Sequence, residues 1–81
     1  MSAQAPAVVS TADLRTARKE IARIERRLSR IADQEATLHQ RMSDQATDHQ
    51  AVIALDAELR ALAAEKDELE AAWLEAAEIV G

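Results

Sequence analysis

Residues 14–42 read LRTARKEIARIERRLSRIADQEATLHQRM, and residues 52–80 read VIALDAELRALAAEKDELEAAWLEAAEIV. In both stretches mostly apolar residues recur at alternating steps of three and four. The first row is Leu14, Ala17, Ile21, Ile24, Leu28, Ile31, Glu35, Leu38 and Met42, and the second is Val52, Leu55, Leu59, Leu62, Lys66, Leu69, Trp73, Ala76 and Val80. This period places one apolar seam along a helix and winds two such helices into a left-handed supercoil.

A short polar gap separates the two rows. Between Asp44 and His49 the only apolar residue is Ala46, and Thr47 with Gln50 matches the Thr-x-x-Gln pattern of a capping box. The gap and the new helix start predict that the chain folds back on itself. A single long helix that forms a parallel dimer is the competing architecture, and the gap weighs against it.

The first helix also has a start signal, because Ser10 precedes Asp13 by three residues and Asp13 suits the first turn. We therefore expect an all-α fold, a two-helix antiparallel coiled-coil hairpin. The predicted organisation is a flexible tail or linker over 1–10 and a hairpin over 11–81, with helices over about 11–42 and 48–79 and a loop over about 43–47.

Two antiparallel registers fit the seam, with facing residue numbers that add to 90 or to 97. The second brings Glu25 towards Glu70, a like-charge contact, whereas the first sets bulky Trp73 against a small residue. We predict the first, which pairs Arg27 with Glu65, Arg18 with Glu70, Trp73 with Ala17 and Leu14 with Ala76. The central seam residues are then Ala17, Ile21, Ile24, Leu28, Ile31, Leu59, Leu62, Leu69 and Trp73.

Three seam positions allow a second interpretation. Glu35 and Lys66 are polar, and we interpret them as residues that specify the register. Trp73 is predicted to pack in the seam, but with Leu74 and Ile79 beside it, it could instead anchor a neighbouring domain.

The composition excludes several classes of function. The chain has 81 residues, one Gly, one Pro and no Cys, which rules out a disulfide scaffold, a thiolate metal site and a glycine-rich phosphate loop. No catalytic arrangement of Ser, His and acid is evident, so we expect no enzyme activity, catalytic residue or cofactor site. No stretch is apolar enough for a membrane helix, and residues 1–9 do not resemble a signal peptide. We expect a cytoplasmic protein without membrane contact.

A metal site is also not expected. His39 and His49 flank the loop and Glu35 lies one turn before His39, which makes a weak site conceivable. The simpler interpretation is two solvated histidines. The acidic cluster around Asp67 and Glu68 lacks the spacing of a calcium loop and is interpreted as a solvated face.

Charge is unevenly distributed. Residues 1–42 hold eight cations and five anions, a net +3, whereas residues 43–81 hold two cations and ten anions, a net −8. On the first helix five cations fall on outward positions and form a stripe about 22 Å long, which could follow a phosphate backbone without reading its sequence. The nucleic-acid candidates are Arg15, Lys19, Arg23, Arg26 and Arg30.

Several stretches resemble the C-terminal coiled-coil domain of ABC-F ATPases over about residues 14–78. They are Arg18-Lys19-Glu20-Ile21, Arg23-Ile24-Glu25-Arg26, Leu38-His39 with Met42, Ala46-Thr47-Asp48-His49, Leu55-Asp56-Ala57-Glu58-Leu59 and Leu69-Glu70-Ala71-Ala72-Trp73-Leu74-Glu75. The last is the most specific. The C-terminal arm of valyl-tRNA synthetase, which binds tRNA, is an antiparallel hairpin of similar size.

The resemblance implies an accessory domain without ATPase activity of its own. ATP and magnesium would be bound by two ATP-binding cassettes elsewhere in the parent protein, which would act on ribosomes in translation. The hairpin would contact DNA or ribosomal RNA through the basic stripe. The rival expectation is a protein-interaction module that holds the cassettes or self-associates weakly.

Overall fold

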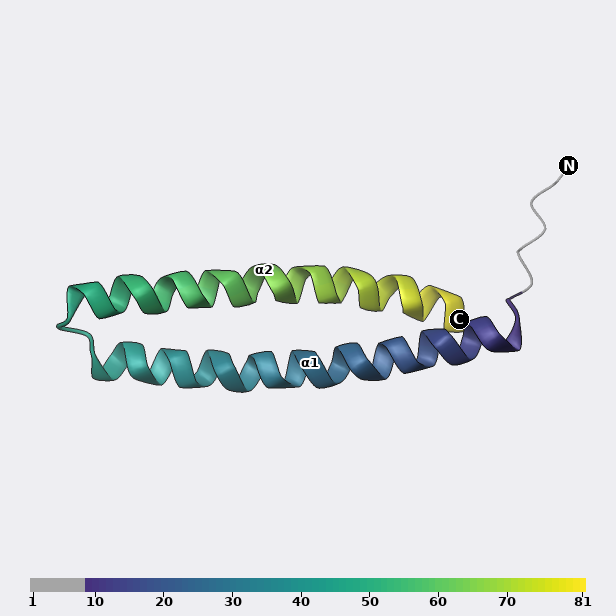
Figure 1. Cartoon of the computed structure of the whole chain (residues 1–81), viewed down its shortest axis with the longest axis horizontal. Coiled ribbons are helices and arrows are strands. Elements are labelled where there is room, and N and C mark those ends of the chain that lie inside the picture. The colour runs from purple at the N-terminus through teal and green to yellow at the C-terminus, as the bar shows by residue number, and fades with distance from the viewer. Residues whose placement is uncertain (1–8) are drawn as a thin grey trace, which may run out of the picture.

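The computed structural model describes residues 9–81 and contains two helices, α1 (Thr11–Asp44) and α2 (His49–Val80). The helices lie side by side and antiparallel, with the turn at one end and the C-terminus beside the first turns of α1 (Figure 1). No strand occurs among the described residues, so the predicted all-α helical hairpin is confirmed. Of the predicted tail, residues 1–8 lie outside the described residues.

The start of α1 follows the sequence prediction. Ser10 is the N-cap, and its hydroxyl accepts a hydrogen bond from the backbone N–H of Asp13 at 3.0 Å. The helix continues two residues beyond its predicted end, because the N–H of Gln45 still donates to the carbonyl of Arg41 at 2.9 Å. In the same turn the side-chain amide of Gln40 donates to the Asp44 carboxylate at 3.0 Å.

The predicted capping box at Thr47 is wrong by one residue. Residues 45–47 form a turn in which the N–H of Asp48 donates to the carbonyl of Gln45 at 2.9 Å. This turn leaves Asp48 in the extended conformation of an N-cap, and its carboxylate accepts from the N–H of Ala51 at 3.1 Å. A carboxylate at this position also interacts favourably with the positive end of the helix dipole.

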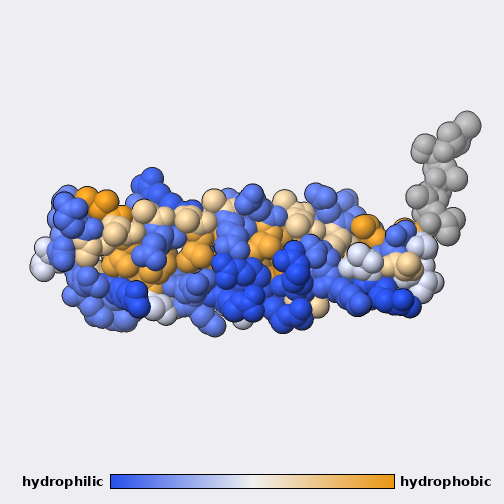
Figure 2. Space-filling view, viewed as in Figure 1, coloured by the Kyte–Doolittle hydropathy of each residue, from blue (hydrophilic) through white to orange (hydrophobic). Residues whose placement is uncertain are grey.

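The core is one row of residues spaced by seven along α1. Ala17, Ile24, Ile31 and Leu38 are buried, and the side chains of Ile24 and Ile31 are completely so. Figure 2 shows hydrophobic side chains along the line between the helices and hydrophilic ones beside them. On α2 the buried residues are Leu55 and Ala76. The other predicted seam residues are half-buried, namely Ile21, Leu28, Leu59, Leu62, Leu69 and Trp73.

The register lies between the two that the seam allows. Asp44 and His49 end and begin the helices at the turn, and Ala17 lines a groove with Ala76 near the open end. Facing residue numbers therefore add to about 93, so Ala17 lies opposite Ala76, and not opposite Trp73 as predicted. The predicted pairing of Leu14 with Ala76 is wrong for the same reason.

The displaced Trp73 has a polar partner that the sequence analysis did not identify. Its indole N–H donates to the carboxylate of Glu25 at 3.1 Å. Glu25 and Glu70 line the same groove as Trp73. The register with a sum of 97 was disfavoured because it brings these two carboxylates together, and the observed register does so in part. The indole N–H offsets their repulsion by donating to Glu25.

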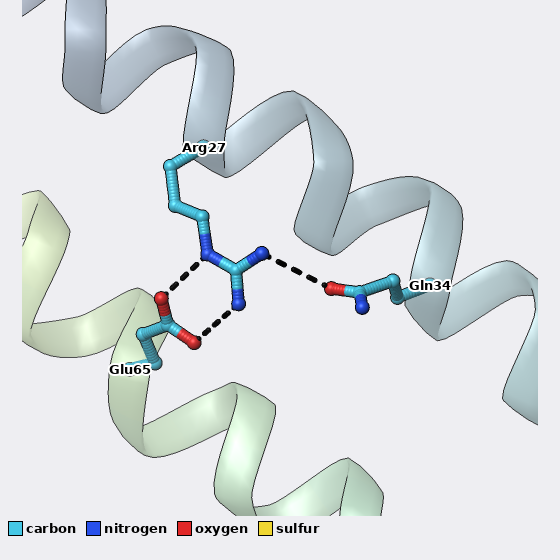
Figure 3. A network of polar contacts seen from close by, with 3 residues as sticks. All are labelled: Arg27, Gln34 and Glu65. Carbon is cyan, nitrogen blue, oxygen red and sulfur yellow. Dashed lines mark hydrogen bonds and ion pairs between the residues drawn. The ribbon is translucent and has the colours of Figure 1, made fainter.

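One predicted charge pair is confirmed. The guanidinium of Arg27 donates from two nitrogens to both carboxylate oxygens of Glu65, each at 2.6 Å, and from the third to Gln34 at 3.4 Å (Figure 3). Paired, parallel hydrogen bonds of this kind fix geometry as well as charge. Within residues 9–81 Arg18 and Glu70 form no ion pair.

The buried row generates a test with matched substitutions. Ile24→Val removes one methyl group from a fully buried site and should lower the free energy of unfolding by about 1 kcal/mol. Ile53→Val makes the same change at a side chain that is 53% exposed, and should change it by less than about 0.5 kcal/mol. Urea unfolding followed by circular dichroism measures both. Equal effects would contradict the assignment of the core.

The Arg27–Glu65 pair predicts a pH dependence. Hydrogen bonding from Arg27 lowers the pKa of the Glu65 carboxyl, so the pair stabilises the fold fully above the unfolded-state pKa, about 4.3. This stabilisation is lost as pH falls through the lowered folded-state pKa. Glu65→Gln should therefore be less stable than the wild type at pH 7, and the difference should disappear in acid. A difference in unfolding free energy that does not change with pH would contradict this account.

Candidate nucleic-acid interface

The five candidate cations share one face of α1. At 100° per residue, Arg15, Lys19, Arg23, Arg26 and Arg30 fall within an arc of about 80° and span about 22 Å along the axis. Their mean direction is about 140° from the buried row at Ile24, so the packing of α1 on α2 turns them outward. All five are exposed. We call this set the basic stripe.

One member of the stripe is already paired. Arg23 donates to both carboxylate oxygens of Glu20, at 2.9 and 2.7 Å. Hydrogen bonding between the two raises the pKa of Arg23 and lowers that of Glu20, so both stay charged near neutral pH. A phosphate that approaches Arg23 must therefore compete with a fixed carboxylate.

The remaining four cations are not neutralised within the part of the chain that the structure describes. Neither Arg26 nor Arg30 forms an ion pair among residues 9–81, and the same holds for Arg15 and Lys19. Asp33, three residues after Arg30, forms no ion pair within the same residues either. Its backbone carbonyl accepts from the Thr37 hydroxyl at 3.1 Å. The stripe thus offers four uncompensated positive charges to solvent.

Arg18 extends the stripe at its N-terminal end, a role that was not predicted from the sequence. Arg18 was expected opposite Glu70, but the observed register leaves it exposed beside Arg15 and Lys19, with which it lines a shallow groove. The spacing of Arg15, Arg18 and Lys19 by three and four residues was the available signal. These side chains place three cations within the first turns of α1.

The opposite side of the hairpin carries the reverse charge. Counted over its length, α2 holds eight anions and two cations, a net −6. One of its two cations, Arg60, is held by Asp56 at 2.8 Å. A polyanion would be attracted by the stripe and repelled by α2, so the distribution of charge confines any contact with nucleic acid to one face.

No metal-binding cluster competes with the basic stripe within residues 9–81. His39 and His49 are both exposed, and no group of three His, Asp or Glu side chains converges to hold a metal ion within residues 9–81. Over the same residues neither helix is long and apolar enough to cross a membrane. The basic stripe is therefore the principal candidate site on this hairpin.

The chain was compared with protein-family models, with curated proteins and with solved structures. None of the three comparisons found a match.

Proposed function

We propose that this hairpin is a non-catalytic module that contacts the phosphate backbone of DNA or RNA through the basic stripe. The proposal is carried by one observation: four exposed and uncompensated cations lie with Arg23 along one face of a helix that packs against its partner helix. Phosphate neutralisation by such cations releases counterions, which supplies most of the affinity of sequence-independent binding.

The surface supports positional contact and offers little for reading sequence. The only aromatic residue is Trp73, which lies with Glu25 and Leu28 away from the stripe. Bases therefore have no aromatic side chain on which to stack, and the contacts are those that bind backbones. The chain as a whole has a net charge of −5, so the module binds weakly and depends on a larger body for firm attachment.

The resemblance to ABC-F proteins suggests such a body. In that setting the hairpin would be carried by two ATP-binding cassettes in a cytoplasmic protein that acts on ribosomes, and ribosomal RNA would be the partner of the stripe. The arm of valyl-tRNA synthetase remains the alternative setting, with tRNA as partner. In either setting we expect the contact to use the basic stripe of α1.

Binding of labelled nucleic acid at several salt concentrations tests the proposal. We expect fluorescence anisotropy to detect weak binding to duplex DNA, a ribosomal RNA fragment and tRNA at low salt. The slope of log affinity against log salt should be about −0.9 per phosphate contacted for the duplex. The double variant Arg26→Gln/Arg30→Gln loses two phosphate contacts, so the magnitude of this slope should fall by about 2. Comparison of the two RNAs distinguishes the two settings.

Arg60→Gln is the matched control, because Arg60 is an exposed arginine on the acidic helix. Arg26→Gln should weaken binding more than Arg60→Gln does, although both remove one positive charge. The proposal fails if no nucleic acid binds at low salt, or if the two single variants weaken binding equally. Circular dichroism of each variant should show unchanged helicity.

A further inference from the structure

A second row of seam residues is only half-buried. These residues alternate with the buried row, and each lies about 50° around the helix from it. Eight of the ten are apolar, so a long strip of apolar surface remains partly in contact with water. The row consists of Leu14, Ile21, Leu28, Glu35 and Met42 on α1, and of Val52, Leu59, Lys66, Trp73 and Val80 on α2.

Both halves of this row lie on the same side of the hairpin. Antiparallel neighbouring helices are related by a local two-fold axis perpendicular to the plane of the hairpin, so equivalent seam positions on the two helices emerge on one side. Accordingly, Leu28 of α1 and Trp73 of α2 line one groove, together with Leu74. Leu74 is 60% exposed, although it lies beside the only tryptophan. We call the ten residues and Leu74 the open face.

We propose that the open face binds a second copy of this chain and forms an antiparallel four-helix bundle. In such a bundle each helix uses two adjacent rows of residues, one for each neighbouring helix. The buried row already serves the partner helix within the hairpin. The open face supplies the second row, with the orientation and the apolar character that a second hairpin requires.

The charged residues of the open face favour one orientation of the second copy. Lys66 lies in the half-buried row, and Glu25 lines the groove of Trp73. A two-fold axis parallel to the helices places α1 of one copy over α2 of the other, so the Lys66 side of α2 faces the Glu25 side of α1. An axis across the helices at their mid-length would place α2 over α2 and bring the two Lys66 side chains together.

The same axis fixes the register between the copies. It keeps every residue at its own height along the bundle, so facing residue numbers again add to about 93. Glu25 of one copy then lies within one turn of Lys66 of the other, and Arg18 lies within about one turn and a half of Glu70. Lys66, a half-buried residue, thereby gains a carboxylate partner across the interface, which accounts for a lysine in the seam.

This dimer leaves the basic stripes free. The two copies of α1 occupy diagonal corners of the bundle, and their stripes point outward from opposite edges. The five residues of the basic stripe therefore stay accessible in the dimer, and only Arg18 lies at the margin of both surfaces. Neither proposal depends on the other.

Two exposed aliphatic side chains near the end of α2 provide a matched test. Leu74 lines the groove of Trp73 in the open face, whereas Ile79, 42% exposed, lines a groove with Ala17 on the other side of the seam. Sedimentation equilibrium over about 1 μM to 1 mM should give a dimer mass at high concentration. Leu74→Glu should raise the dissociation constant at least about tenfold by placing a charge in the interface, and Ile79→Glu should leave it unchanged.

The emission of Trp73 provides an independent reading, because association should shift it to shorter wavelength as concentration rises. Both exposed sites tolerate glutamate in the monomer, so circular dichroism should show the hairpin intact in each variant. A single-chain mass throughout the concentration range would overturn the proposal, and so would dissociation by Ile79→Glu as strong as that by Leu74→Glu.

The orientation of the copies can be measured separately. The chain has no cysteine, so Thr47→Cys in the turn accepts one spin label per copy. Dipolar spectroscopy should give a label separation of about 20 Å if the turns lie at the same end, since neighbouring helix axes are about 10 Å apart. A separation of about 50 Å, one helix length, would place the turns at opposite ends and reject the proposed two-fold axis.

Discussion

A row of α1 side chains spaced by seven residues lies directly against α2, and its burial holds the hairpin together. Ile24 and Ile31 are at its centre, and both are completely buried. Two paired helices bury apolar side chains only along the line where they meet, because they enclose no globular core. The apolar contact along this line must therefore supply most of the tertiary stabilisation. Because the buried row faces α2, it also sets which way every other side chain of α1 points relative to α2.

The three surfaces of the hairpin follow from that orientation. The half-buried row lies about 50° around each helix and forms the open face, while the basic stripe points away from α2. Arg27 occupies an intermediate position, close enough to reach Glu65 across the seam. Charges of one sign therefore gather on the outside of α1, and charges of the other sign cover α2. The two proposals, contact with nucleic acid and binding of a second hairpin, would therefore use different sides of the molecule.

The hairpin could be predicted from the sequence because a long three-four pattern has few structural solutions. The polar gap before His49 distinguished the hairpin from a single long helix, and the Ser10 cap was also legible. The register between the helices could not be predicted correctly from the sequence. The seam pattern allowed facing residue numbers to add only to 90 or 97, whereas the tight turn over residues 45–48 sets a sum near 93. One hydrogen bond, from Asp48 to Gln45, fixes this turn, and such a local choice has no periodic signal.

The candidate site was predictable to the extent that it depends on helical phase. The spacing of the five cations places them on one face whatever the register. The role of Arg18 depended on the register, and its assignment to Glu70 failed with it. The partner of Trp73 could not be foreseen either, since the indole reaches Glu25 only after the helices have shifted by about one turn. The face of a helix on which each residue lies could therefore be predicted from the sequence. The contacts between the two helices could be identified only in the structure.

Amide chemical shifts of the isotopically labelled chain, recorded during titration with a short RNA or DNA duplex, test the central claim most directly. The account predicts that the largest changes occur at residues 15–30 of α1, on the side of the basic stripe, and diminish as salt is added. Changes concentrated on α2, or at the indole N–H of Trp73, would contradict it.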